Sequence, residues 1–263
     1  MPTQEQKAAE FRALHEGDPF VIPNPWDAGS ARVLEGIGFT ALATTSGGFA
    51  YTLGRVDGAV SLDEMTEHVR TLDQASALPV SVDLENGSGP APDDAARAIK
   101  AAAEAGAVGG SIEDWGPESG LYEREHAAER IAAAREAADS LGFPFTLTAR
   151  AENYFRGRHD LDDTIARLRA YEEAGADVVY APALPELEDV RAVCEGTTKP
   201  VNVLAKPRFS LSEMVDAGAQ RVSVGSWLAM VSVGALIDTA QRIRDDGDFS
   251  SLRTPPELAD WLG

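Results

Sequence analysis

Two carboxylates stand at the end of one predicted strand, where negative charge is unexpected. Asp83 and Glu85 follow the apolar run that ends at Val82, and a Gly-rich turn comes directly after them. In an extended strand these two positions point to the same side, so both charges would face the same neighbours. Such a pair is costly unless a cation lies between the carboxylates. From this stretch alone two interpretations are possible, a divalent metal site and a simple capped turn before Pro90.

A second pair of acids repeats this pattern. Glu113 and Asp114 end the next predicted strand, and Asp57 lies in a long connection earlier in the chain. If these segments meet, four or five carboxylates surround one point, and their mutual repulsion raises their pKa values. A divalent cation would relieve the repulsion. A set rich in carboxylates and poor in histidine suits Mg²⁺ or Mn²⁺ better than Zn²⁺.

Other groups at predicted strand ends could bind an anion. Arg150 could fork onto a substrate carboxylate, or it could only pair with Glu152 or Glu113. The stretch 44–48, TTSGG, offers hydroxyl and unhindered backbone N–H groups. That signal is weak by itself because Gly-rich turns are common. Both features predict an anionic small-molecule ligand.

A repeated phrase shows which elements must position these residues. A helix end, a glycine and a β-rich run follow one another at 34–46, 103–114, 172–183 and 215–226. A glycine directly after a helix is typical of a left-handed C-cap. Recurrence of this phrase along the chain indicates repeated βα units.

Between these phrases the pattern predicts eight strands that alternate with helices. The expected strands are 20–23, 41–45, 79–85, 109–114, 145–152, 178–182, 200–205 and 221–226, and the expected helices are 27–35, 61–74, 92–105, 126–140, 161–173, 184–193, 210–217 and 227–242. Short, continuously apolar strands in alternation with helices favour an α/β fold, a closed (β/α)8 TIM-type barrel. An open doubly wound sheet would need a nucleotide fingerprint after the first strand, and none is present.

The barrel is expected to form one domain over residues 1–263. A helix at 3–15 and a tail from 249 are additions to the eight units, and the tail could serve a subunit contact. The C-terminal ends of all strands meet at one mouth, which would gather the acids, Arg150 and TTSGG with two further candidate binding residues, Trp26 and Asn202. Long connections at 46–59 and 115–125 are expected to shape that mouth.

Composition excludes several classes of function. The 43 acidic residues outnumber the 23 basic ones and give a formal charge of -20, which repels nucleic acid and anionic membranes. The single cysteine, Cys194, permits no internal disulfide, and the start of the chain lacks an export signal. The longest apolar run, 227–237, is too short to cross a bilayer and is expected to be a buried helix. A cytoplasmic protein is expected.

Five motifs together resemble the isocitrate lyase/phosphoenolpyruvate mutase superfamily. They are NPWDAGSARVLEGIGFTALATTSGG, VDLENG, SIEDW, TARAEN and RVSVGS, in the superfamily's order and at similar spacing from about residue 20 to about residue 230. The resemblance implies an α/β barrel that forms homodimers or homotetramers by exchange of the last barrel helix. It also implies Mg²⁺ and a small 2-oxo or 2-hydroxy carboxylic acid as substrate.

The resemblance also implies roles for individual residues. By position, Asp83 would be the direct metal ligand, and Asp57, Glu85 and Glu113 would hold the metal through water. The substrate carboxylate would be bound by Ser46, Gly47 and Gly48, with Arg150 opposite.

The loop 115–124 departs from the family pattern. Superfamily lyases that split isocitrate or methylisocitrate carry K-(K/R)-C-G-H here, with the cysteine as acid/base, whereas this chain reads WGPESGLYER. Mutases that form phosphonopyruvate place lysine, asparagine and serine in this loop, and only Ser119 matches that set. Cleavage of isocitrate or methylisocitrate is therefore not expected. Mutase chemistry is not expected either.

These observations predict an Mg²⁺-dependent C–C lyase or decarboxylase that acts through an enolate. Decarboxylation is favoured because CO₂ leaves without a general base. Arg150 and Glu113 are expected at the reacting end, and any further acid/base is sought among Glu118, Tyr122, Glu152 and His126. A phosphonopyruvate-type P–C hydrolase or mutase and a non-catalytic metabolite-binding barrel are the alternatives.

Overall fold

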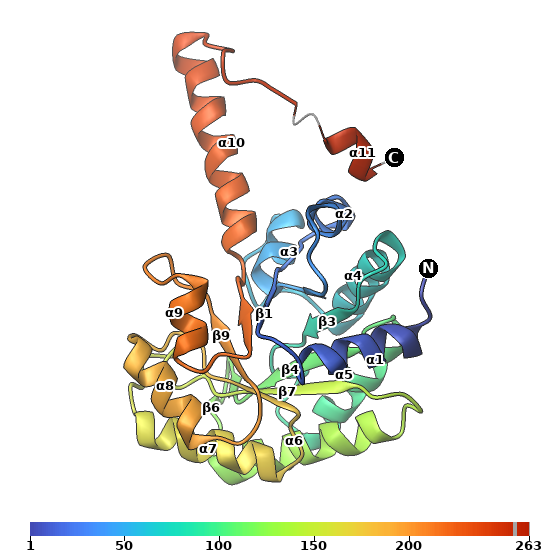
Figure 1. The fold of residues 1–263 in the computed structure, drawn as a ribbon, viewed down its shortest axis with the longest axis vertical. Helices are drawn as coiled ribbons and strands as arrows, with labels where there is room; N and C mark the ends of the chain where they lie inside the picture. The colour runs from blue at the N-terminus through green and yellow to red at the C-terminus, as the bar shows by residue number, and fades with distance from the viewer. Residues whose placement is uncertain (255–256, 263) are drawn as a thin grey trace.

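Eight parallel strands form the centre of the computed structural model, which describes residues 1–254 and 257–262 (Figure 1). The strands are β1 (Phe20–Ile22), β2 (Leu42–Ala43), β3 (Val80–Asp83), β4 (Gly109–Glu113), β7 (Thr146–Arg150), β8 (Val178–Tyr180), β9 (Val201–Leu204) and β10 (Arg221–Ser223). Their order is β1-β10-β9-β8-β7-β4-β3-β2. The Ala43 N–H donates to the Pro23 carbonyl at 3.0 Å and joins the two outer strands. The predicted (β/α)8 architecture is confirmed.

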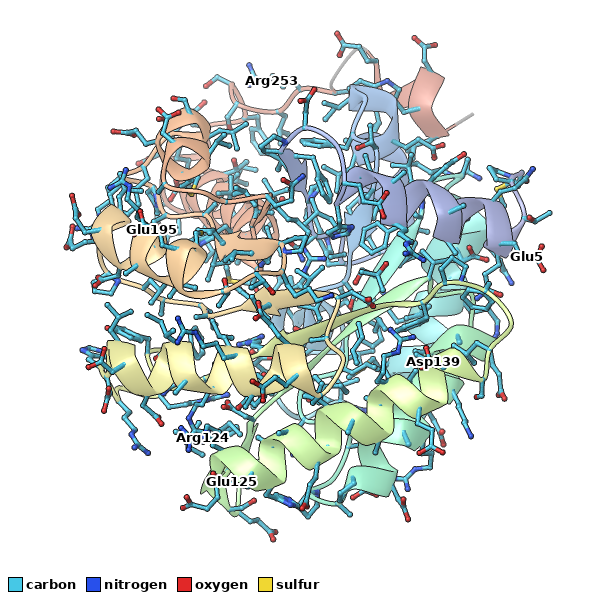
Figure 2. All side chains as sticks on the ribbon, turned by 60° about the horizontal axis from the view of Figure 1, so that its bottom comes forward. Glu5, Arg124, Glu125, Asp139, Glu195 and Arg253 are labelled. Atoms are coloured by element: carbon cyan, nitrogen blue, oxygen red, sulfur yellow. The ribbon has the colours of Figure 1, made fainter. Side chains whose placement is uncertain are left out.

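Helices alternate with these strands as the sequence pattern predicts. They are α2 (Ala28–Ile37), α4 (Leu62–Ala75), α5 (Pro92–Glu104), α6 (Arg124–Asp139), α7 (Leu161–Glu173), α8 (Leu187–Gly196), α9 (Leu211–Asp216) and α10 (Trp227–Asp246). Gly38 ends α2 with φ 104°, the left-handed conformation that the repeated phrase indicated. Charged side chains such as Glu5, Glu125, Asp139 and Glu195 lie at the periphery of the molecule (Figure 2).

The two long connections are ordered elements. The segment expected as a loop after β2 contains a short helix, α3 (Ser46–Thr52), whose first turn is capped by the Thr45 side chain. The connection after β4 forms an antiparallel hairpin of β5 (Trp115–Gly116) and β6 (Gly120–Leu121). The mouth is therefore shaped by a capped helix and a tight hairpin.

The N-terminal end of the barrel is closed by α1 (Gln4–Leu14). Phe11 of this helix is fully buried and packs with Ile22, Ala41 and Val108. Gly109 makes that contact possible, because a Cβ at this position would lie 2.7 Å from the Phe11 ring. The predicted N-terminal helix thus seals one end of the barrel and leaves the other end open.

The last barrel helix, α10, projects away from the strands (Figure 1). Trp227 is 51% exposed and Val231 66%, so the expectation of a buried helix is wrong for the single chain. The sequence pattern showed the apolar character of α10 but not what covers it. Exchange of this helix between subunits, which would cover it, stays a prediction.

The tail returns to the barrel as α11 (Leu258–Leu262), which lies beside α2. There Arg32 Nη1 donates to the Leu262 carbonyl at 2.9 Å. The remaining parts of the predicted tail, 255–256 and 263, lie outside the described residues. No helix in the described ranges is both long enough and apolar enough to cross a membrane.

Candidate active site

The C-terminal ends of the strands surround a cavity of about 960 Å³. This end of a (β/α)8 barrel is where binding and catalytic groups collect. The predicted site residues that line the cavity are Ser46, Asp57, Asp83, Glu85, Glu113, Glu118, Tyr122, Arg150 and Asn202. Three predicted substrate-binding residues, Trp26, Gly47 and Gly48, do not line it.

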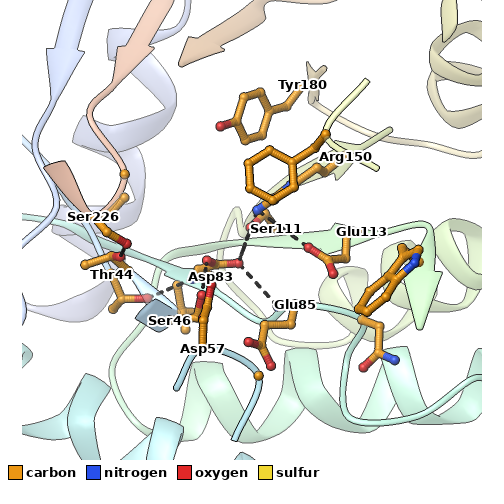
Figure 3. Close-up of a pocket in the computed structure, with 18 of the residues that line it drawn as sticks. Thr44, Ser46, Asp57, Asp83, Glu85, Ser111, Glu113, Arg150, Tyr180 and Ser226 are labelled. Atoms are coloured by element: carbon orange, nitrogen blue, oxygen red, sulfur yellow. Dashed lines mark hydrogen bonds and ion pairs between the residues drawn. The ribbon is translucent and has the colours of Figure 1, made fainter. Parts of the chain in front are cut away.

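Asp83 is held at the end of β3 by hydroxyl groups from β4, from the start of α3 and from the segment after β2 (Figure 3). Its carboxylate accepts from Ser46 Oγ at 3.1 Å and from Ser111 Oγ at 3.5 Å. Its own N–H donates to Thr44 Oγ1 at 2.8 Å. These hydrogen bonds orient the carboxylate and make no use of a counter-charge. Asp83 is therefore a preorganised oxygen donor at the cavity wall.

Glu85 reaches the same cavity by a different backbone route from the one expected. The strand ends at Asp83, and Glu85 has φ 49°, a left-handed conformation that is rare outside glycine. Burial, followed by the charges of Asp83 and Asp57, raises the pKa of Glu85 to about 7. The turn thus brings a third acid toward two others, at a cost in backbone strain and in charge repulsion.

Glu113 lies at the end of β4 between two guanidinium groups. Its Oε2 is 3.5 Å from Arg150 Nη1, and its Oε1 is 3.6 Å from Arg156 Nη2. Its pKa is nevertheless raised, because burial outweighs the arginines and because Glu152 and Asp83 add negative charge. Both Glu85 and Glu113 are thus carboxyl groups that a further cation would favour in the charged form.

Glu152 fixes both arginines. This carboxylate is fully buried, accepts from Arg150 Nε at 2.5 Å and forms an ion pair with Arg156 Nε at 2.9 Å. Arg150 therefore pairs with Glu152 and Glu113, as one of the two sequence readings allowed. Arg150 still borders the cavity, and its Nη1 lies 3.9 Å from Asp83 Oδ1. A role for Arg150 in substrate binding stays a prediction.

The TTSGG stretch places the Ser46 side chain in the cavity wall and two closely packed glycines behind it. Ser46 lines the cavity, while the Gly48 N–H donates to Thr45 Oγ1 at 3.2 Å and is not free for a ligand. A Cβ at Gly47 would lie 2.9 Å from Ser226 Oγ, and one at Gly48 would lie 3.3 Å from Trp26 Cβ. Both glycines are thus closely packed between α3 and its neighbours.

Asp114 does not join the acid cluster, which corrects the expectation from the sequence. Its Oδ2 accepts from the Tyr171 hydroxyl at 2.5 Å and from Arg167 Nη1 at 3.1 Å, both on α7. Its Oδ1 accepts from the Glu152 N–H at 2.7 Å. Successive strand residues point to opposite faces, so Glu113 faces the barrel interior and Asp114 the helix layer. Asp114 therefore anchors the segment that carries Glu152.

The segment 115–124, which forms the hairpin, carries two of the predicted acid/base residues. Glu118 is exposed at its tip, between β5 and β6. Tyr122 is buried, its hydroxyl accepts from Asn86 Nδ2 at 3.3 Å, and it lines the cavity. His126 instead contacts the Pro90 carbonyl at 2.8 Å and is not in the cavity wall.

Several cavity residues were missed by sequence reasoning. Ser111 could have been found, because it lies two positions before Glu113 on the same strand face. Tyr180 ends β8, and burial raises its pKa to about 12. Arg156 comes from the irregular segment after β7 and lies with its guanidinium 3.5 Å from the centre of the Trp115 ring. No sequence period marks such a loop residue.

The acids fit a magnesium ion held mainly through water. In the described parts of the chain, no three His, Cys, Asp or Glu side chains converge into a complete direct ligand set. Asp83, Glu85, Glu113 and Asp57 nevertheless line one cavity, with two raised pKa values among them. Mg²⁺ usually keeps several waters and is bound through one or two carboxylates. Asp83 would be the direct ligand, and the other three would contact the metal's waters.

The affinity for Mg²⁺ should rise with pH through the pKa of Glu85. That pKa is about 7 against an ordinary 4.5, so below 7 a proton competes with the metal. We expect titration calorimetry to show tighter binding at about pH 8 than at about pH 6, by up to roughly tenfold per pH unit. Glu85→Gln should flatten this dependence, and equal affinity at both pH values in the native protein would contradict the assignment.

The same raised pKa affects the metal-free fold in the opposite direction. The folded state holds the Glu85 proton more tightly than the unfolded chain does. The resulting stabilisation is complete below the ordinary pKa of 4.5 and is lost as pH rises through 7.

Comparisons with known proteins place the whole barrel in one group. Residues 11–244 match the family model described as phosphoenolpyruvate phosphomutase. An oxaloacetate decarboxylase of Rhodopseudomonas palustris (strain BisB5) is 33% identical over 225 residues, 81% of this chain and 75% of that protein. A solved structure of a putative lyase/mutase from Burkholderia cenocepacia J2315 superposes with a TM-score of 0.95 at 49% identity and covers 98% of this chain and 96% of its own. The structure of a 2,3-dimethylmalate lyase superposes with a TM-score of 0.88 at 26% identity and covers 100% and 95%.

Proposed function

The chain belongs to the phosphoenolpyruvate phosphomutase family, and from this premise we propose that it is an Mg²⁺-dependent lyase or decarboxylase. Its substrate would be a small 2-oxo or 2-hydroxy carboxylic acid, in which it breaks a C–C bond through an enolate. The observation that carries the proposal is the meeting of Asp83, Glu85 and Glu113 with Arg150 at the barrel mouth. Relatives named as an oxaloacetate decarboxylase and a 2,3-dimethylmalate lyase support this class of substrate.

The proposed division of labour follows from the geometry. When bound, Mg²⁺ would supply a Lewis acid for the negative charge that develops on the substrate oxygen. Ser46 and Ser111 hold Asp83 in place for that role. Arg150 would bind the substrate carboxylate, with its guanidinium fixed by Glu152 so that little orientation is lost on binding.

Among the acid/base candidates, Tyr122 has the best position to hold a proton. Tyr122 borders the cavity, and its hydroxyl lies 3.3 Å from Asn86 Nδ2, another cavity residue. Glu118 is solvated at the hairpin tip, and Glu152 is occupied by the two arginines. Loss of CO₂ from a 2-oxo diacid leaves an enolate that needs a proton but no base. The absence of cysteine, lysine and histidine from 115–124 therefore favours decarboxylation.

A substrate panel tests this proposal. Release of pyruvate or a homologous 2-oxo acid would be measured from oxaloacetate and substituted malates, with Mg²⁺ and with a chelator. We expect turnover of at least one acid that depends on Mg²⁺; no turnover of any member would contradict the proposal. Phosphate release from phosphonopyruvate in the same panel would indicate the P–C hydrolase alternative, and tight binding without turnover would indicate the metabolite-binding alternative.

Arg156 should favour substrates with a second carboxylate. Its Nε forms a close ion pair with Glu152 at 2.9 Å, whereas its Nη2 lies 3.6 Å from Glu113. The side chain is 31% exposed. A hydrogen bond between charged groups contributes about 1.5–3 kcal/mol, so Arg156→Met should raise KM for a 2-oxo diacid by roughly 10- to 100-fold. KM for a monocarboxylic 2-oxo acid should change little.

Arg208→Met is the matched control for this change. Arg208 also pairs with a glutamate, Glu186 at 3.0 Å, and also stacks on an aromatic ring, that of Phe209, but it does not line the cavity. Its removal should leave both KM values unchanged. An equal rise in KM for diacids and monoacids in Arg156→Met would show that Arg156 only supports Glu152.

A further inference from the structure

A guanidinium without a carboxylate partner lies inside the barrel, below the acid cluster. Arg221 begins β10, is 5% exposed and borders the same cavity. Its nitrogens contact Asn202 Oδ1 at 2.8 Å, Thr148 Oγ1 at 3.1 Å and His15 Nε2 at 3.2 Å. Among the described residues it forms no ion pair within 4.0 Å. The barrel therefore holds a buried positive charge with only neutral hydrogen-bond partners.

His15 supplies no counter-charge from below. Its Nδ1 lies 2.8 Å from the Phe11 carbonyl, which can only accept, so Nδ1 carries the proton and Nε2 accepts from Arg221. Burial and the charge of Arg221 lower the pKa of His15 to about 3, so this ring is neutral at ordinary pH. The contact is a hydrogen bond to a neutral acceptor.

An unpaired charge at this depth is expensive. Transfer of an isolated ion out of water costs far more than a neutral hydrogen bond returns. Burial lowers the pKa of Arg221 to about 10, so the group stays protonated at neutral pH. Its three hydrogen-bond partners, Asn202, Thr148 and the neutral His15, carry no charge that would offset it. An anion from outside the chain would supply the missing counter-charge.

The surroundings leave room for a small ligand. The interior of a (β/α)8 barrel is ordinarily filled by bulky branched side chains. Here the cavity wall beside Arg221 includes the short polar side chains of Asn202, which accepts from Arg221, and Ser223, which accepts from Asn202 Nδ2 at 3.0 Å. Arginine has more N–H donors than its three neutral acceptors use, and hydroxyl groups are further donors. The Arg221 guanidinium thus has unused N–H donors and borders a cavity.

We infer that Arg221 and the hydroxyl groups around it form an anion-binding site on the floor of the barrel. Its ligand is a small monovalent anion, a carboxylate or a halide. The anion could be a remote carboxylate of the substrate or a free ion from solution. The site is distinct from the acid cluster with Arg150 and needs no turnover, so it stands independently of the proposed function.

Bromide is a suitable probe for this site. Crystals of the full-length native protein grown with sodium bromide should show an anomalous peak within hydrogen-bonding distance of the Arg221 guanidinium. In solution, bromide should raise the unfolding midpoint by about 2–4 °C relative to 2-(N-morpholino)ethanesulfonate, a bulky anion that is neither a carboxylate nor a halide, at equal ionic strength. Absence of both the peak and the shift would overturn the inference.

Variants locate the effect and identify the source of the anion. Arg221→Met should abolish the bromide shift and Arg221→Lys should keep part of it, whereas the exposed control Arg208→Met should respond as the native protein does. A full bromide shift in Arg221→Met would overturn the inference. If the variant does not fold, the crystal of the native protein still decides.

Kinetics separate the two sources, provided that a substrate is known. If a substrate carboxylate occupies the floor, bromide should compete with that substrate and raise its KM. If a free ion is the resident ligand, bromide should raise the midpoint without changing KM.

Discussion

Asp83→Ala should abolish Mg²⁺-dependent turnover and leave the barrel folded. Asp83 is the acid that two hydroxyl groups orient and that has no close ion pair, with Arg150 Nη1 3.9 Å away. Mutation of a residue that only hydrogen-bonds to a metal ligand lowers metal affinity or activity by about 10- to 100-fold. Loss of the direct ligand should therefore lower kcat/KM by more than about 100-fold. Turnover would be measured with the best acid of the substrate panel.

The fold should tolerate this change because Asp83 repels its neighbours. Its charge raises the pKa of both Glu85 and Glu113. The unfolding free energy without metal should therefore stay within about 1 kcal/mol of the native value in urea titrations. Asp139→Asn, a change at an exposed acid, is the control. Activity that survives in Asp83→Ala would rule out Asp83 as the metal ligand.

Arg150→Met should lose both activity and stability. Without the guanidinium, two nearly fully buried carboxylates, Glu113 and Glu152, lose a close partner. Removal of one member of a buried ion pair costs about 3–5 kcal/mol, and a misplaced substrate costs about 100-fold in rate. Denaturant unfolding and steady-state kinetics would measure the two losses separately.

A double variant separates the structural role of Arg150 from its role in substrate binding. Arg150→Met with Glu152→Gln removes the carboxylate that Arg150 Nε neutralises at 2.5 Å. We expect this double variant to regain part of the stability and none of the activity. Recovery of activity together with stability would show that Arg150 only holds Glu152 and does not bind substrate.

The sequence predicted the barrel well because its signals are local. Strand and helix periods, with a glycine such as Gly38 at a helix end, act over a few residues and do not depend on distant contacts. The same holds for Asp83 and Glu113, since both end strands and strand alternation decides which face they occupy. The acid pair at the cavity could therefore be predicted from the sequence.

Errors arose where a local signal had two outcomes. Asp114 follows Glu113 directly and was grouped with it, but alternation turns its side chain toward Arg167 and Tyr171 on α7. The apolar character of 227–237 predicted burial, yet α10 projects from the barrel with Trp227 51% exposed. In both cases the residue types indicated a charged or an apolar contact. The sequence did not show which part of the chain, if any, lies against them.

The sequence by itself determined the (β/α)8 barrel, the mouth at its C-terminal end and the acids that face the barrel interior. Only the tertiary structure decided which charges are paired: Glu152 with two arginines, Asp114 with Arg167, and Arg221 with no acid among the described residues. The physical reason is that periodicity determines the direction of a side chain along its own element. The partner across a cavity depends on how strands, helices and loops distant in the sequence pack together.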